Sequence, residues 1–254
     1  MKKNLLPNGE KMQKGIWSLA SFTLLLIFTT LACAVPGFEE SGPDPTPTPI
    51  GDTMFFNIPA YTYQLSPGDT IPGTQLKYND RQGDAYQVNI DGQTTLKRSG
   101  DSFYWSGVIA PGVFANFNLR LTTSMLGGMP VMGPVEIIVL NPAPAEAPSV
   151  PLVENTLPFS NILVDYSVPV GYTIPGTTLV YEGIEERGQG GQLTDFARLS
   201  GTAGYPYLAF GDSLVWTGKL LDNVYLRYNL RVTSLQEESL RLSGTAELWV
   251  LPKS

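Results

Sequence analysis

Short runs of alternating apolar and polar residues cover most of the chain after residue 52. In residues 117–122, for example, Phe117, Leu119 and Leu121 alternate with polar side chains, which is typical of a strand with one buried face. Runs of this kind predict strands at residues 54–58, 61–65, 74–79, 85–90, 94–98, 102–109, 113–123 and 135–140. Short strands at near-regular spacing, separated by turn sequences, predict a β-sandwich or a small β-barrel.

The chain contains an internal repeat. The sequence TIPGT at residues 70–74 returns unchanged at residues 173–177. A second block, residues 100–123, matches residues 211–234 at ten of 24 positions. Self-similarity over this length predicts two tandem domains that share one fold.

The repeat also predicts the domain boundaries of an all-β protein. We expect one β domain at residues 53–142 and a second at residues 157–254, joined by a Pro-rich linker at residues 143–156. The spacing between matching positions grows inside the second copy, which places an insertion at residues 182–192. The polar, Gly-rich sequence of this insertion predicts a loop that the first domain lacks.

The first 32 residues follow a different pattern. Four lysines precede an uncharged, mostly apolar run from Ile16 to Ala32. A positive segment followed by an apolar run is typical of a secretory signal peptide. We therefore expect residues 1–32 to direct export of the rest of the chain.

The signal ends in Thr30-Leu31-Ala32-Cys33, which resembles the lipobox of bacterial lipoproteins. In that family the matching cysteine carries a diacylglyceryl thioether, so the resemblance implies lipidation of Cys33 and anchoring to the outer face of a bacterial membrane. Cys33 is the only cysteine, which excludes an internal disulfide. Two alternatives stay open: ordinary signal cleavage after Ala34, and an uncleaved membrane span.

Composition changes again after Cys33. Residues 33–52 are Pro-rich and lack apolar periodicity, which predicts an extended tether of polyproline II type. Without residues 1–32 the chain has 12 basic and 22 acidic residues, a net charge of −10. This acidic balance argues against nucleic acid as a partner.

One short motif suggests catalysis. Residues 211–214 spell GDSL and resemble the nucleophile block of a family of serine esterases and lipases. That family activates its serine with a histidine, and this chain contains no histidine. The matching residues 100–103 read as a turn that leads into a strand. We therefore expect a noncatalytic protein.

Metal and cofactor chemistry is also not indicated. The absence of His and of a second Cys argues against the usual zinc, iron and copper sites, and no cofactor motif is present. Calcium needs only oxygen ligands, which Asp80 with Asp84, or the glutamates of the insertion, would supply. Neither group has a recognised ligand spacing, so we expect no metal.

Opposite charges recur at one separation in both domains. Arg120 and Glu136 in the first domain correspond to Arg231 and Glu247 in the second. With the first hairpin centred near Gly128, each arginine would face its glutamate across neighbouring strands. We predict two structural cross-strand pairs.

Two tryptophans are shared by the domains. Trp105 alternates with Phe103, and Trp216 alternates with Leu214. A ligand platform is one interpretation of shared tryptophans, but this alternation favours the buried face of a strand. We predict that both indoles belong to the core.

Tyr205 and Tyr207 have no aromatic counterpart in the first domain. Together with Glu185, Glu186 and Arg187 of the insertion, they form the candidate binding face. Exposed aromatic side chains beside polar groups suit a glycan or a protein partner. The alternative is packing of the tyrosines on an edge strand.

These observations predict an exported, lipid-anchored envelope protein that binds or adheres without catalysis, with a glycan or an envelope protein as partner. A structural or assembly component of the cell envelope is the second hypothesis. A glycan hydrolase is the third, because no pair of carboxylates stands out among the 22 acidic residues after the signal.

Overall fold

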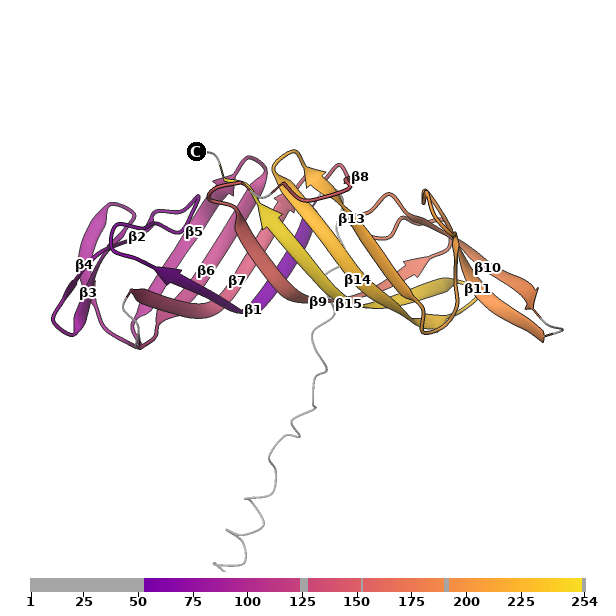
Figure 1. Cartoon of the computed structure of the whole chain (residues 1–254), viewed down its shortest axis with the longest axis horizontal. Helices are drawn as coiled ribbons and strands as arrows, with labels where there is room; N and C mark the ends of the chain where they lie inside the picture. The colour runs from indigo at the N-terminus through magenta and orange to yellow at the C-terminus, as the bar shows by residue number, and fades with distance from the viewer. Residues whose placement is uncertain (1–52, 124–127, 152, 190–191, 253–254) are drawn as a thin grey trace, which may run out of the picture. The chain divides into compact units, whose positions relative to one another are not determined.

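The computed structural model describes residues 53–123, 128–151, 153–189 and 192–252 (Figure 1). These residues form several antiparallel sheets and no helix, which confirms the predicted all-β class. The predicted signal peptide, Cys33 and the tether at residues 33–52 lie outside the described residues. Within the described ranges, no helix has the length and apolar character needed to cross a membrane.

Two sheets arise from the first half of the described chain. A four-stranded sheet has the order β1-β7-β6-β5, and a three-stranded sheet has the order β2-β3-β4. The strands are β1 (Thr53–Leu65), β2 (Leu76–Gln82), β3 (Ala85–Ile90), β4 (Gln93–Lys97), β5 (Ser102–Ala110), β6 (Val113–Leu121) and β7 (Met129–Leu140). The two strands predicted at residues 54–58 and 61–65 are one strand with a register shift between Ile58 and Tyr61.

The second half repeats this order of strands. A five-stranded sheet has the order β8-β13-β14-β15-β9, and a three-stranded sheet has the order β10-β11-β12. The strands are β8 (Ala145–Glu146), β9 (Leu157–Pro169), β10 (Val180–Gln189), β11 (Gln192–Ser200), β12 (Tyr207–Leu208), β13 (Ser213–Leu221), β14 (Val224–Leu235) and β15 (Ser239–Val250).

The TIPGT sequence forms the same turn in both halves. The Thr74 amide donates to Ile71 O at 3.1 Å, with Pro72 second and Gly73 third in the turn, and the φ of Gly73 is +74°. A positive φ at the third position defines a type II turn and requires glycine. The Thr74 hydroxyl also donates to Ile71 O at 2.8 Å and accepts from the Leu76 amide at 3.0 Å. The five residues therefore recur because each has a role in the turn.

The second TIPGT turn keeps these contacts. The Thr177 hydroxyl donates to Ile174 O at 2.9 Å and accepts from the Leu179 amide at 3.0 Å. A Cβ on Gly176 would lie 2.7 Å from Cε of Met54 in β1. Glycine is therefore needed here both for its φ and for close packing against a strand of the first half.

The buried side chains of both halves form one continuous hydrophobic cluster. Phe159 of β9 packs against two rings of the first half, with its centroid 5.2 Å from Tyr61 and 6.5 Å from Phe117. The halves therefore share core contacts. That each half is a separate domain stays a prediction.

Trp105 and Trp216 are buried, which confirms their predicted place in the core. Each indole covers the glycine two positions later on its own strand, because a Cβ on Gly107 or Gly218 would collide with the indole ring. Residues two apart on a strand share a face, so a large aromatic ring needs a small neighbour here.

Part of the predicted linker belongs to a sheet. The strand β8 pairs with β13, with Ala145 opposite Lys219. Nearby, the amide of Ala143 donates to Leu220 O at 2.7 Å. Residues 143–147 therefore extend the five-stranded sheet rather than only joining two domains.

The predicted cross-strand charge pair of the first half is wrong. Arg120 faces Met132, and Glu136 faces Asn116, whose Nδ2 donates to Oε2 of Glu136 at 3.1 Å. This register is centred two residues before Gly128. The pairing is shifted by an even number of residues, so Arg120 and Glu136 still lie on the outward face as predicted.

The corresponding pair of the second half is also wrong. Arg231 faces Ser243, and Glu247 faces Arg227. The spacing of the charges recurs between the halves because the register recurs. In neither half does the arginine lie opposite the glutamate.

Candidate functional site

The insertion at residues 182–192 lengthens a hairpin. In the first half, β2 and β3 pair from Leu76 to Gln82, whereas β10 and β11 pair from Val180 to Gln189 (Figure 1). The predicted loop is therefore largely strand. The insertion supplies extra cross-strand positions that the first half does not have.

The pairing register decides which predicted site residues meet. Glu185 and Arg187 alternate with Glu186 along β10, so Glu186 points to the opposite face of the hairpin. Arg198 of β11 faces Tyr207 of β12 directly. One face therefore carries four of these residues, which are Glu185, Arg187, Arg198 and Tyr207. Glu186 lies on the other face.

Tyr207 is held by two side chains of β10. The guanidinium carbon of Arg187 lies 3.8 Å from the centre of the Tyr207 ring, a cation–π contact. The Tyr207 hydroxyl donates to Oε2 of Glu185 at 3.2 Å. Arg187 and Glu185 are two residues apart on one face of β10, so one contacts the face of the Tyr207 ring and the other its hydroxyl.

Glu185 links this arrangement to two arginines. Its Oε1 lies 3.3 Å from Nε of Arg187, and its Oε2 lies 3.8 Å from Nη1 of Arg198. Two guanidinium groups and one carboxylate give the cluster one net positive charge, although the chain as a whole is acidic. These groups are partly exposed, so salt screens their attraction.

Tyr205 completes the cluster. Its ring meets that of Tyr207 edge to face, with centroids 5.5 Å apart, and 69% of Tyr205 is exposed. We call Glu185, Arg187, Arg198, Tyr205 and Tyr207 the tyrosine face. An exposed aromatic ring supported by a fixed second ring can stack on a ligand without first being ordered.

Sequence reasoning found four members of the tyrosine face and missed Arg198. Nothing in the sequence marks Arg198, because its place depends on the register between β11 and β12. Glu186 was included because it adjoins Glu185 in sequence. Its cross-strand neighbour is instead Asp195.

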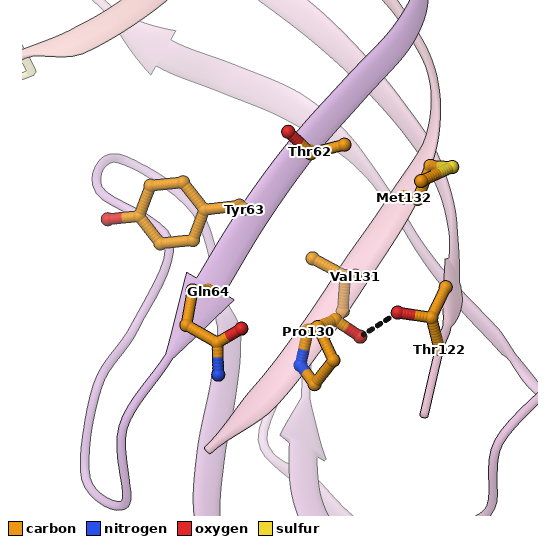
Figure 2. A pocket seen from close by; sticks show the side chains of 7 residues that line it. All are labelled: Thr62, Tyr63, Gln64, Thr122, Pro130, Val131 and Met132. Carbon is orange, nitrogen blue, oxygen red and sulfur yellow. Dashed lines mark hydrogen bonds between the residues drawn. The ribbon is translucent and has the colours of Figure 1, made fainter. Parts of the chain in front are cut away.

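A second recess lies on the first half. Its volume is about 330 Å³. Figure 2 shows the side chains that line it, those of Thr62, Tyr63, Gln64, Thr122, Pro130, Val131 and Met132. The Thr122 hydroxyl donates to Pro130 O at 3.4 Å (Figure 2). The lining contains hydroxyl groups and a thioether but no charged side chain, so it offers little chemistry.

The second half fills the corresponding position with charge. Asp165 and Ser243 face each other as Thr62 and Met132 do in the first half. Nε of Arg241 donates to Oδ1 of Asp165 at 3.1 Å, and the Ser243 hydroxyl donates to the same oxygen at 2.6 Å. The bond from Arg241 lowers the pKa of the Asp165 carboxyl. This ion pair is a feature of the second half alone.

The GDSL sequence forms a turn. The Asp212 carboxylate accepts from the Ala209 amide at 2.8 Å, and the φ of Gly211 is +85°. In the first half, Asp101 accepts from the Arg98 amide at the same distance. Ser213 then begins β13 opposite Arg231, which is a poor base. The motif recurs because both halves need this turn.

The calcium candidates have other partners or lie apart. Oδ2 of Asp84 lies 3.0 Å from Nε of Arg98, and Glu182 accepts from the Ser200 hydroxyl. Among the residues that the structure describes, no three His, Cys, Asp or Glu side chains gather to hold a metal ion.

Comparison with known proteins gives no further guide. No protein family, no curated protein and no solved structure matches this chain.

Proposed function

We propose that the protein is an exported, lipid-anchored envelope protein whose second half binds a glycan without catalysis. The tyrosine face carries this proposal. It combines an exposed ring, Tyr205, with a second ring that Arg187 and Glu185 hold in place. Aromatic surface for stacking and fixed polar groups for hydrogen bonding are what a sugar ligand requires.

Differences between the halves support the location. The first half has no aromatic residue at the positions of Tyr205 and Tyr207. Its shorter hairpin has the uncharged Gln82 at the position of Glu185 and no paired position that matches Arg187. Features shared by both halves, such as the TIPGT turn, serve folding. Features found in one half alone are better candidates for binding.

The test uses the chain produced from residue 34 onward, which lacks the predicted signal and lipidation site. Binding to purified cell-wall glycans and polysaccharides is measured for this protein and for Tyr205→Ala/Tyr207→Ala. Tyr104→Ala, an exposed tyrosine of β5, is the matched control. Binding that only the double variant loses supports the proposal, whereas failure of the unaltered chain to bind any glycan contradicts it.

Lipid anchoring rests on the lipobox resemblance and is tested separately. Cells that express the full chain are labelled with a fatty acid, and Cys33→Ser is compared with the unaltered protein. We expect the label to disappear in Cys33→Ser and the protein to leave the membrane fraction. A label retained by Cys33→Ser would rule out Cys33 as the acceptor.

One observation favours envelope assembly as a second candidate function. Phe114 and Ile138 face each other on the outward side of the first large sheet, and Tyr225 and Trp249 do so at corresponding positions of the second. All four side chains are partly exposed. Matching apolar rows suit a protein partner that contacts both halves, which crosslinking in intact cells from Phe114 and Trp249 would detect.

A further inference from the structure

A hollow on the second half is lined by side chains of the kinds that bind a sugar ring. Its volume is about 440 Å³. The start of β11, the turn before β13 and the end of β14 enclose it. The lining residues are Thr194, Asp195, Ala209, Phe210, Thr233, Ser234 and Leu235.

Phe210 supplies an aromatic surface. It is 71% exposed, more than any other large apolar side chain that the structure describes. The turn that carries it is fixed, since the Asp212 amide donates to Ala209 O at 3.1 Å and the Gly211 amide donates to Val232 O at 2.9 Å. The corresponding turn of the first half has Ser99 in place of Phe210. The turn therefore does not need an aromatic residue.

Asp195 supplies an acceptor. It faces Glu186 across β10 and β11, and both are exposed. Like charges directly opposite in a sheet are destabilising. In the described parts of the chain, the Asp195 carboxylate has no hydrogen-bond or ion-pair partner. Ligand groups that donate hydrogen bonds would relieve this repulsion.

Hydroxyl groups complete the lining. Thr194 and Ser234 make no side-chain hydrogen bond among the described residues, and Thr233 lies 3.3 Å from the Ser243 hydroxyl. An exposed ring, a free carboxylate and hydroxyl groups around an open hollow match the faces of a pyranose. Its C–H face is apolar, and its rim carries hydroxyl donors and acceptors.

We propose that this hollow binds one ring of a neutral glycan, with the ring stacked on Phe210 and its hydroxyls donating to Asp195. The inference rests on the proposed glycan-binding function and names the ligand class. Phe210 lies five residues after Tyr205 in the same segment of the chain. The carboxylates of Asp195 and Glu186 disfavour acidic sugars.

The experiment measures binding of three defined hexasaccharides by titration calorimetry. The chain from residue 34 onward is titrated with cellohexaose, chitohexaose and the acidic hexamer of galacturonic acid. Phe210→Ala, Asp195→Asn, Tyr205→Ala/Tyr207→Ala and the control Tyr104→Ala are titrated alongside. Circular dichroism and the melting temperature confirm that each variant is folded.

We expect a neutral hexamer to bind and Phe210→Ala to weaken it about tenfold, in the range of a stacking contact. Asp195→Asn should weaken the neutral hexamer and improve binding of the acidic one, a change that simple misfolding would not produce. Tyr104→Ala should leave affinity unchanged.

The outcomes separate this inference from the proposed function. Neutral binding that Phe210→Ala leaves intact but Tyr205→Ala/Tyr207→Ala abolishes overturns the Phe210 subsite and keeps the tyrosine face. The reverse pattern keeps the subsite and overturns the tyrosine face. Absence of binding to all three hexamers overturns the Phe210 subsite, whereas the proposed function is overturned only if the purified cell-wall glycans and polysaccharides also fail to bind.

Discussion

The Arg187 guanidinium carbon lies 3.8 Å from the centre of the Tyr207 ring, while the Tyr207 hydroxyl donates to Glu185. Glu185 and Arg187 are two residues apart on β10. A side chain on a surface hairpin is normally free to change rotamer. Here a cation covers one face of the ring, and a carboxylate fixes its tip. Tyr207 is therefore the fixed part of the tyrosine face, and Tyr205 is its open part.

Arg187→Ala should release the Tyr207 ring. We expect a loss of about 0.5–1 kcal/mol in the free energy of unfolding, the range for an exposed cation–π contact. Arg187→Lys keeps the charge and should retain part of this energy. Denaturation by urea gives the free energies, and NMR of the Tyr207 ring reports its mobility. Equal stability of all three proteins would show that the contact contributes nothing.

Tyr166 and Tyr228 form a buried hydrogen bond, with their hydroxyl oxygens 2.8 Å apart. Tyr166→Phe should lower the free energy of unfolding by about 1–3 kcal/mol, because the Tyr228 hydroxyl stays buried without a partner. Tyr166→Phe/Tyr228→Phe removes both polar groups and should recover part of the loss. The first half already has Phe117 at the position of Tyr228. A double variant that is less stable than the single one would contradict this account.

The same pair predicts sensitivity to alkaline pH. Burial raises the pKa of the Tyr166 hydroxyl to about 12, and burial with the neighbouring Tyr166 raises that of Tyr228. Unfolded tyrosine titrates near pH 10, so the folded protein keeps protons that the unfolded chain releases. Stability should be complete below about pH 10 and fall as the pH rises toward 12.

The melting temperature as a function of pH tests this prediction, with phenolate absorbance reporting ionisation. In Tyr166→Phe/Tyr228→Phe the alkaline fall should be shallower. An unchanged slope in the double variant would assign the fall to other groups.

Gly218→Ala should destabilise the five-stranded sheet. The new Cβ would collide with the Trp216 indole and lie 2.5 Å from Ala145 O of β8. Overpacking of this kind costs about 1–3 kcal/mol. Gly204→Ala is the control, since the nearest atom to its Cβ would be 3.7 Å away. Thermal unfolding compares the two, and similar melting temperatures would argue against the Trp216 contact.

Local pattern predicted the strands well. Alternation identified β3, β5 and β6 within a residue or two, because each buries one face and ends at a turn with its own sequence. The GDSL turn was equally accessible, since its Asp212 accepts from Ala209, three residues away in sequence. The TIPGT sequence marked the repeat, and its turn was seen only in the structure.

Features that depend on pairing were not predicted. The register placed Arg120 opposite Met132, β8 joined β13, and the insertion became part of a hairpin. Each outcome is set by contacts between residues distant in the chain. The candidate site shows the same limit: Tyr205 and Tyr207 were found by comparing the two copies of the repeat, whereas Arg198 and Phe210 needed the fold.

The prolines before β8 have a further consequence. Ala143 donates its amide to β13, and alternate residues of an extended chain point their amides in opposite directions. The positions on either side of Ala143 are Pro142 and Pro144, which have no amide to offer outward. At residues 142–144 the edge of the sheet therefore lacks the amide donors that a strand of a neighbouring molecule would need for pairing. Copies of the protein at high concentration would be kept from joining into fibres along this edge.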